Sequence, residues 1–391
     1  MTDQPPRPSD DVLGLAGVRV LDVTTNVAGP FATQILGDLG ADVVKVERPS
    51  GGDDTRGWGP PNWPQSGESV TFSSLNRNKR SIALDLTAAE DRAVFERLLA
   101  DADVLVQSMR PGAFERLGYG RERLQALNHA LIYAELRGFG PLGPLADEPA
   151  YDPLMQAFSG LMSLTGEAGR APVRIPVSIL DKGTGLWTAI GILNALRRRD
   201  ATGRGAHVVT SLLETALTWE STQLAGYLAN GEVPEPLGSA TAGIAPYQAF
   251  ATADAHIVIA AGNQRLWQKL CVALERPELL EDERFADNSR RFENRDALER
   301  ELTATLRTRP AERWVETLAR AGVPASVIRR IDEVAEDAQV RALGALARVP
   351  HPTQEGYTLV HTPILTDGSR FPLRSNPPAL DADGPALRED S

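Results

Sequence analysis

The first hydrophobic pattern along the chain predicts a strand, a helix and a second strand. Residues 18–23 (VRVLDV) form a short run rich in β-branched apolar residues, which predicts a buried strand. Pro30 suits the first turn of a helix, and the apolar positions over 31–39 recur at helical spacing. Residues 42–47 (DVVKVE) predict another strand. This order is a βαβ unit, in which the two strands are parallel.

The same alternation continues beyond this unit. We expect strands over 81–86, 104–107 and 131–136, and helices over 88–99, 112–117 and 121–127. From residue 152 the pattern is mainly helical, with a helix from near Lys182 to Arg199, a strand over 208–212 and a helix over 214–229. Such alternation predicts an open, mainly parallel sheet with helices on both faces.

The pattern changes after residue 236. Two apolar runs over 247–252 and 256–261 predict a hairpin, and helical spacing follows over 264–274, 296–308 and 311–321. The expected fold class is therefore α/β, with a Rossmann-like large domain and a smaller α+β domain. We assign 12–229 to the first part of the large domain, 236–328 to the small domain, 330–375 to a return to the large domain, and 1–11 and 376–391 to flexible tails.

The composition narrows the class of protein. The chain has 391 residues, which favours two domains, and a formal net charge of -11. An acidic balance argues against nucleic acid or an anionic membrane as the main partner. We see no signal peptide and no apolar run of about 18 residues. The single cysteine, Cys271, has apolar neighbours at helical spacing. We therefore expect a cytoplasmic protein in which Cys271 is a core residue rather than a nucleophile.

The βαβ start raises the question of a dinucleotide cofactor. Glu47 ends the second strand, where dinucleotide-binding folds place an acid that binds ribose. The turn over 24–29 (TTNVAG), however, lacks the spaced glycines that let a pyrophosphate approach the backbone. The residues favour a Rossmann-like fold whose ligand is not NAD, and an NAD-dependent dehydrogenase is only a remote alternative.

Basic residues gather in the turns of the alternating region. Arginine offers paired donors to phosphate, and the loops at strand ends are where such sheets bind ligands. Solvated surface charge is the better interpretation of any single one of them, but several together suit a polyphosphate. These residues are Arg48, Arg56, Arg77, Lys79, Arg80, Arg110 and Arg116.

Asp181 follows the apolar residues 177–180 and precedes Lys182 and Gly183. The simplest interpretation is a helix N-cap, because aspartate accepts hydrogen bonds from free N–H groups at that position. A carboxylate at a helix start is also a possible nucleophile, and the nearby glycines would leave room for a bulky thioester. No histidine is spaced with a carboxylate or cysteine as a metal site requires, so we expect no metal.

Several long blocks resemble the family III (CaiB/BaiF-type) CoA-transferases. The resemblance spans about residues 14–375, nearly the whole chain. It is specific because the blocks are long and occur in the family's order. They are 15–61, 72–86, 102–120, 150–166, the ILDKGTG block over 179–185, and 245–267.

The resemblance implies a nucleophile, a CoA site and an assembly. The family's catalytic aspartate falls at Asp181, and the family forms interlocked homodimers. Arg48 and Arg116 match the family in charge and position, whereas Val27 replaces a glutamine of some members and Ser108 an asparagine of many. Carried over by position, the CoA-binding residues are Val27, Ala28, Arg48, Leu84, Ser108, Met109, Arg110, Arg116 and Tyr151.

The resemblance also implies the chemistry. Asp181 would form an anhydride with the acyl group of the donor and then a thioester with CoA, before CoA passes to a carboxylic acid acceptor. Backbone N–H groups at a helix start are expected to stabilise the oxyanions. Coenzyme A is then a substrate, and no cofactor is required. The blocks over 76–81 and 241–250 look closest to members that use succinyl-CoA and short dicarboxylates.

A second activity within the family is an alternative. The family contains 2-methylacyl-CoA racemases, which carry a histidine beside the aspartate of the AYD block. This chain has Tyr151 at that position, so the acid/base pair of the racemase is incomplete. The departure favours a transferase.

Overall fold

The computed structural model describes residues 8–389, which form two compact units. Within these residues the large unit comprises 8–161, 174–232 and 338–389, and the small unit comprises 162–173 and 233–337. Residues 162–173 belong to the small unit because Glu167 bridges to Leu237 and Gly238 donates to the carbonyl of Gly166. The chain returns to the large unit at residue 338, later than the expected residue 330.

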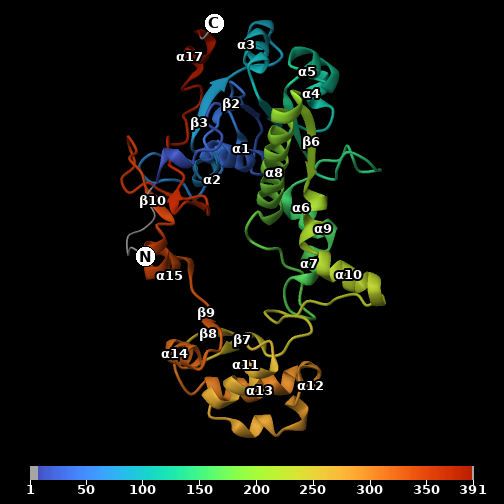
Figure 1. The fold of residues 1–391 in the computed structure, drawn as a ribbon, viewed down its shortest axis with the longest axis vertical. Coiled ribbons are helices and arrows are strands. Elements are labelled where there is room, and N and C mark those ends of the chain that lie inside the picture. Colours follow the sequence, from blue (N-terminus) through green and yellow to red (C-terminus); the bar gives the residue numbers. More distant parts are fainter. Residues whose placement is uncertain (1–7, 390–391) are drawn as a thin grey trace. The chain divides into compact units, whose positions relative to one another are not determined.

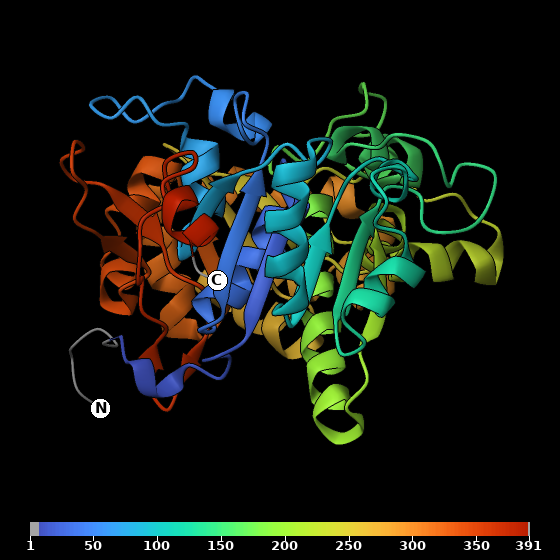
Figure 2. The same cartoon turned by 90° about the horizontal axis from the view of Figure 1, so that it is seen from above.

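The large unit is built on a six-stranded, wholly parallel sheet with the order β3-β2-β1-β4-β5-β6. This part of the expected fold class is confirmed. Figure 2 shows its blue to green strands next to one another. The order reverses between β1 and β4, where sheets of this kind bind ligands beyond the carboxyl ends of the strands. The strands are β1 (Arg19–Val23), β2 (Asp42–Glu47), β3 (Lys79–Ala83), β4 (Val104–Gln107), β5 (Ile132–Arg137) and β6 (Ala206–Ser211).

Helices cover both faces of this sheet (Figure 1). α1 (Ala28–Asp38) and α8 (Ile179–Thr202) pack their apolar residues on one face, and α3 (Ala89–Ala100), α4 (Ala113–Arg116) and α5 (Arg121–Leu127) pack on the other. The remaining helices of this unit are η1 (Asp10–Val12), η2 (Asp54–Gly57), α2 (Val70–Leu75), α6 (Asp152–Ser159), α9 (Leu212–Trp219), α10 (Ser221–Asn230), α16 (Ala338–Leu343) and α17 (Gly384–Glu389). α7 (Leu161–Leu164) crosses the boundary between the units.

Several boundaries differ from those expected. β3 ends at Ala83, because Asp85 turns the chain by accepting from the N–H of Thr87. Leu84 and Leu86 beyond the strand are nevertheless buried, so their apolar pattern alone indicated a longer strand. α8 begins at Ile179, and the helix expected over 214–229 is divided into α9 and α10 at Glu220.

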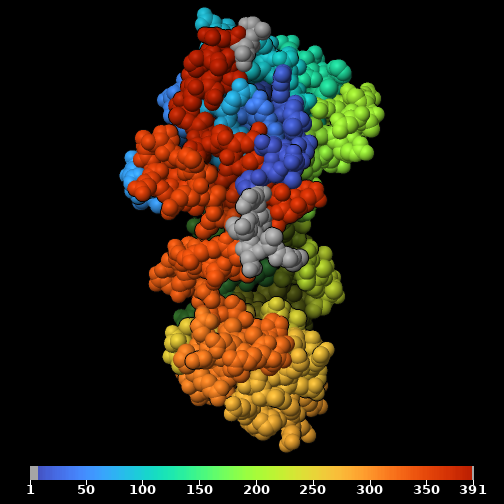
Figure 3. Space-filling model, turned by 60° about the vertical axis from the view of Figure 1, so that its left-hand side comes forward, coloured from blue at the N-terminus to red at the C-terminus, as the bar shows by residue number. Residues whose placement is uncertain are grey.

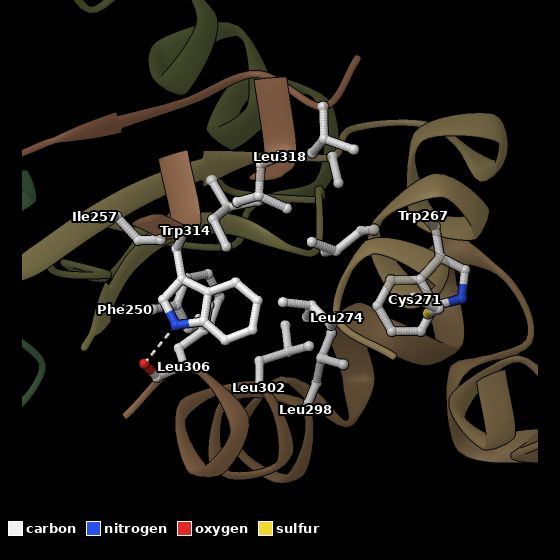
Figure 4. Packing of buried hydrophobic residues seen from close by; sticks show 14 of the residues in the cluster. Phe250, Ile257, Trp267, Cys271, Leu274, Leu298, Leu302, Leu306, Trp314 and Leu318 are labelled. Carbon is white, nitrogen blue, oxygen red and sulfur yellow. Dashed lines mark hydrogen bonds between the residues drawn. The ribbon is translucent and has the colours of Figure 1, made fainter. Parts of the chain in front are cut away.

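The small unit joins the antiparallel sheet β7-β8-β9 to a set of helices around one apolar core (Figure 4). Trp314 Nε1 donates to the carbonyl of Leu306 at 2.7 Å inside this core. Cys271 is fully buried there, and burial raises the pKa of its thiol to about 12, so the prediction of a core residue is confirmed. The elements are β7 (Tyr247–Ala251), β8 (His256–Ala260), β9 (Ala325–Val327), α11 (Gln264–Ala273), η3 (Pro277–Leu280), η4 (Glu283–Phe285), α12 (Asn288–Glu293), α13 (Arg295–Leu306), α14 (Ala311–Ala321) and α15 (Ile331–Ala335).

The C-terminal return closes the outer edge of the large sheet. It contains the pairs β10 (Leu346–Arg348) with β11 (Thr358–Val360) and β12 (Leu365–Thr366) with β13 (Ser369–Arg370). Residues 376–389 are held rather than free, unlike the expected tail: Asp381 accepts from the N–H of Ala83, and Asp383 from that of Ser81. Figure 3 shows this dark red segment against blue and cyan residues. Of the tail expected over 1–11, residues 1–7 lie outside the described residues.

Candidate active site

A cavity of about 440 Å³ lies where the order of the sheet reverses, and it contains Asp181. Its walls are the turn after β1, the segment after β4, the end of β5 and the starts of α6 and α8. Chain reversals at the carboxyl ends of parallel strands bring these distant segments together. We call this space the catalytic cavity.

A second hollow of about 640 Å³ adjoins the catalytic cavity. It lies over the segments that follow β2 and β3, and it shares Thr25, Asp54 and Met109 with the catalytic cavity as lining residues. The two hollows therefore adjoin as one groove across the carboxyl ends of the strands. We call the second hollow the outer groove.

Asp181 is the third residue of α8 and is not its N-cap, so that interpretation of the sequence is wrong. The N-cap is Ser178, whose side chain makes no capping hydrogen bond. The buried Asp152 at the start of α6 supplies the cap instead, because its Oδ2 accepts from the N–H groups of Leu180 at 2.7 Å and of Asp181 at 3.1 Å. The side chain of Asp181 is thus released from capping and lines the cavity.

The surroundings of Asp181 favour its neutral form. Burial, and then the neighbouring carboxylate of Asp152, raise the pKa of Asp181 from 3.8 to about 7. A carboxylate that is partly protonated near neutral pH is a more basic and more reactive nucleophile once ionised. It also repels an incoming anionic substrate less than a permanently charged group would.

The first turn of α8 has no free backbone donor to offer a substrate. Ile179 donates to Val177, Leu180 and Asp181 donate to Asp152, and Lys182 donates to Ser178. The expectation that N–H groups at this helix start stabilise an oxyanion is therefore wrong for α8. The field of the helix still acts on Asp181, because the side chain lies within the first turn.

The glycines after Asp181 serve helix packing rather than space for a thioester. A Cβ at Gly185 would lie 2.5 Å from the carbonyl oxygen of Ala28, and one at Gly183 would lie 2.8 Å from Thr215 and Trp219 side-chain atoms. These contacts let α1 and α9 approach α8 closely and fix the position of Asp181 against the turn after β1.

Most of the predicted CoA-binding residues lie along the groove. Val27, Ala28, Ser108, Met109, Arg110 and Tyr151 line the catalytic cavity with Asp181, whereas Arg48, Leu84 and again Met109 line the outer groove. Arg116 lines neither hollow, although Leu117 beside it lines the outer groove. The arginine lies on α4 and approaches Gly112, at which a Cβ would be 2.8 Å from its guanidinium.

The turn after β1 rests on buried charges that sequence reasoning did not assign. Asn26 has a φ of +67° and donates its N–H to Asp53. Lys45 reaches Asp53 at 2.8 Å and donates to the carbonyl of Thr24 at 2.9 Å, with no exposure of either charged group. The sequence does carry one sign of this buried charge, which is a lysine between Val44 and Val46 in a strand that is buried on both faces.

A second buried pair extends this cluster. Lys79 lies 3.0 Å from Asp22, and Lys45 lies 4.0 Å from the same carboxylate. Burial lowers the pKa of Lys79 to about 8, whereas the two ammonium groups hold the pKa of Asp22 below its ordinary value in spite of burial. The cluster therefore depends on its pairing, because each charge is out of contact with water.

Glu47, the acid considered for a ribose, is already engaged. It pairs with Arg56 at 2.7 Å and accepts from Ser81 and from the N–H of Asp53. Burial opposes ionisation, but these partners lower its pKa below the ordinary value. This carboxylate lines the outer groove, but its oxygens are already engaged in supporting the loop after β2.

We expect Asp152→Asn to shift the pH dependence of activity. An asparagine oxygen still accepts from the start of α8, but the negative charge is lost, so the pKa of Asp181 should fall from about 7. A carboxylate attacks a thioester only in its ionised form, so with Asp181 in the expected role the loss of rate at acidic pH should begin at a lower pH. Rates over pH 5–9 measure this, with Glu148→Gln in the same lining as the control. Identical acidic limbs in Asp152→Asn and the parent would contradict the charge coupling.

The described residues show no group of three or more side chains arranged to hold a metal ion. No helix among them is long and apolar enough to cross a membrane.

Comparison with known proteins agrees with this geometry. The model of a family described as "CoA-transferase family III" matches residues 15–384. The chain is 39% identical to an acetyl-CoA:oxalate CoA-transferase of Acetobacter aceti, covering 96% of this chain and 95% of the relative. It is 38% identical to a succinyl-CoA:glutarate CoA-transferase of Mus musculus, covering 90% and 80%.

Two further proteins extend the comparison. A succinyl-CoA:mesaconate CoA-transferase of Haloarcula hispanica is 36% identical, with 92% of this chain and 93% of the relative covered. The crystal structure of a CaiB/BaiF family protein from Brucella suis superposes with a TM-score of 0.86 at 38% identity, over 96% of this chain and 98% of that one.

Proposed function

This chain belongs to CoA-transferase family III and is a CoA-transferase, and from that premise we propose that it moves CoA to a short dicarboxylic acid through covalent intermediates on Asp181. The observation that carries the proposal is the single groove that joins Asp181 to a row of loops at the strand ends. A long acyl-CoA can place its thioester at one end of such a groove and its phosphates at the other.

The outer groove receives the nucleotide part of CoA in this proposal. Arg48 is 62% exposed, so its guanidinium can exchange its contact with Asp54 for a phosphate. Arg116 lines neither hollow, and its part in this proposal rests on its position beside Leu117, which lines the outer groove. In the catalytic cavity Val27, Ala28, Ser108, Met109, Arg110 and Tyr151 would surround the pantetheine arm and the thioester, with Leu84 at the outer end.

The reaction proceeds by exchange at carbonyl carbons. The carboxylate of Asp181 attacks the acyl carbon of the donor, the C–S bond breaks, and CoA leaves as a thiolate with an aspartyl anhydride remaining. The thiolate attacks the aspartyl carbon and releases the donor acid, which gives an aspartyl-CoA thioester. The acceptor carboxylate attacks this thioester to form a second anhydride, and the thiolate then takes the acceptor's acyl group and frees Asp181. Each step is redox-neutral, so the proposal requires no cofactor and no metal.

The acceptor is proposed from the relatives and from the cavity. The compared relatives are named for oxalate, glutarate and mesaconate, which are all short dicarboxylates. The described lining of the catalytic cavity includes Arg110 and Arg137. An arginine can pair with the second carboxylate of a dicarboxylic acid, the one that does not receive CoA. A screen of CoA donors against dicarboxylates of two to six carbons, with products identified by mass, names the pair.

The racemase alternative receives no support from the cavity. Racemisation needs an acid and a base on opposite sides of the α-carbon. Tyr151 is 54% exposed at the position of the missing histidine, and no histidine occurs in the described lining of either hollow. Exchange of the α-proton of a 2-methylacyl-CoA in deuterated water would favour the racemase.

An apolar surface supports the expected homodimer. Leu186, Trp187 and Ile190 on α8 are 38–46% exposed. Neighbouring exposed residues lie on α9 and α10, and Trp187 contacts Trp219 at 6.3 Å between ring centroids. Monomeric proteins rarely expose a contiguous patch of this kind. We therefore propose that a second copy covers it in an interlocked dimer, and sedimentation equilibrium that returned the mass of one chain would argue against this assembly.

Trapping tests the covalent route. The side-chain carbonyl of Asp181 becomes electrophilic only during turnover, as an anhydride or a thioester. Hydroxylamine added with acyl-CoA should convert Asp181 to a hydroxamate, and borohydride should reduce the thioester to an alcohol at the same residue. Peptide mass mapping locates both changes, and omission of acyl-CoA is the control. An unmodified Asp181 peptide under confirmed turnover would reject covalent catalysis.

A further inference from the structure

A third cavity lies at the opposite end of β5 and β6 from the catalytic cavity. It has a volume of about 570 Å³, which falls within the range of about 300–1,000 Å³ for small-molecule sites. Its lining includes Leu131 just before β5 and Ala206 at the start of β6, whereas the catalytic cavity is lined by Arg137 and Gly138 at the other end of β5. It is therefore separate from the groove proposed for CoA, and we call it the distal cavity.

The charge of the distal cavity is positive in an acidic protein. Its described lining includes no carboxylate, although the chain has a formal net charge of -11. The cationic and imidazole groups come from α5, the segment between α5 and β5, the end of α8, the segment before β6 and β6 itself. They are Arg121, His129, Arg198, Arg204 and His207. Convergence of such groups from different elements distinguishes the distal cavity from a run of solvated charge along one helix.

The inner wall of the distal cavity is aromatic and rigid. Tyr133 and His207 stack with their ring centroids 4.9 Å apart and an interplanar angle of 5°. Tyr133 is 5% exposed, and the adjoining Leu124 and Leu131 are buried. A preformed wall with cationic groups at its rim suits a small anion, because binding does not require the wall to become ordered.

Two short lines of contacts lead from this stacked pair to the catalytic cavity. In the first, Nε2 of Gln107 donates to Tyr133 Oη at 3.0 Å, and its Oε1 accepts from the N–H of Met109 at 2.7 Å. Met109 lines both the catalytic cavity and the outer groove. Gln107 is 2% exposed, so water does not reach its side chain to replace either of these hydrogen bonds.

The second line runs along the same face of β5. His207 contacts Glu135 at 3.2 Å, and Glu135 pairs with Arg137 at 2.7 Å. Burial opposes ionisation of Glu135, but His207 and Arg137 hold its pKa below the ordinary value. Arg137 lines the catalytic cavity, so a charge placed beside His207 acts on the ion pair that positions this arginine.

We propose that the distal cavity is a second ligand site, which binds a small polyanion carrying phosphate or carboxylate groups and modulates binding in the catalytic cavity through Tyr133 and His207. The anion pairs with the arginines at the rim and rests on the stacked rings. A change at His207 redistributes the hydrogen bonds of Glu135 between His207 and Arg137. This regulation is separate from the identity of the transferred acyl group.

Binding is tested with two probes on the whole protein in the presence of saturating CoA. Inorganic tripolyphosphate represents a phosphate source, and citrate represents a carboxylate source. The test variant is Arg121→Gln/Arg198→Gln, and the matched control is Arg123→Gln/Arg197→Gln, which removes the same charge from the same helices outside the cavity lining. We expect calorimetry to show a dissociation constant about ten-fold or more higher in the test variant only.

Coupling is tested by the rate of CoA transfer at subsaturating acyl-CoA. The bound probe should change the KM for acyl-CoA in the parent and in the control variant, and this change should be lost in the test variant. Competition at the CoA groove would affect all three proteins equally. Absence of binding by both probes, or equal affinity in the two variants, overturns the site. Binding that leaves the KM unchanged overturns the coupling.

Discussion

Replacement of Asp181 by asparagine is expected to lower the rate of CoA transfer by about 10⁴-fold or more, because an amide cannot form the anhydride on which the route depends. The affinity for CoA should change little, since the outer groove is untouched. Glu148→Gln, in the same cavity lining, should retain most of the activity. A well-folded Asp181→Asn protein with substantial turnover would remove this residue from the nucleophilic role.

The same substitution should stabilise the fold at alkaline pH. The pKa of Asp181 is raised from 3.8 to about 7, so the folded state binds the proton more tightly than the unfolded state. The tighter binding of this proton adds to the free energy of unfolding. Its contribution is fully present below the pKa of the unfolded state and is lost as the pH rises through the pKa of the folded state. An asparagine keeps the neutral shape, and the variant should therefore exceed the parent in unfolding free energy at pH 8 by roughly 1–3 kcal/mol. Equal denaturation midpoints at pH 8 would show that the site does not oppose ionisation.

Replacement of Lys45 by methionine is expected to cost about 3–5 kcal/mol of unfolding free energy, because it leaves the buried carboxylate of Asp53 without its cation. The turn after β1 loses its support at the same time, so the KM for acyl-CoA should rise in whatever protein remains folded. Denaturant unfolding measures the first effect, and initial rates measure the second.

Two control variants test whether the loss of unfolding free energy in Lys45→Met comes from leaving a buried carboxylate unpaired. Lys45→Met/Asp53→Asn removes both charges while an asparagine oxygen still accepts from Asn26, so it should recover part of the loss. Arg80→Met breaks an ion pair between β3 and β2, but its members are 38% and 46% exposed, and the cost should stay below about 1 kcal/mol. Equal losses of unfolding free energy in Lys45→Met and Arg80→Met would show that burial of the ion pair does not determine the cost of breaking it.

The hydrophobic pattern predicted the strands of the large sheet well because their periodicity is local. β4 was predicted with both of its ends, since a continuous apolar run bounded by polar residues has one simple interpretation. The parallel arrangement followed from the intervening helices. What the pattern did not contain was that the pairing of β3 ends at Ala83, because buried extended chain and buried strand have the same apolar residues.

The active site shows where local reasoning ends. The pattern around Asp181 indicated a cap, and only the fold reveals that Asp152, from another helix, performs that task. Lys45 likewise reads as an interruption of an apolar strand until its partners are seen. Both residues act through pairs that are distant in sequence, and a single sequence carries no sign of which charges will meet.

The closure of β3 by the C-terminal return has a consequence for biosynthesis. The outer N–H and carbonyl groups of Ser81 and Ala83 pair with Asp381, Asp383 and Arg388, which follow them by about three hundred residues. While the ribosome is still making the small unit, this edge stands open to any other extended chain. The nascent protein thus depends on residues 381–388 to cover an aggregation-prone edge, and a chaperone that covers the edge during translation would take the place that these residues occupy in the folded molecule.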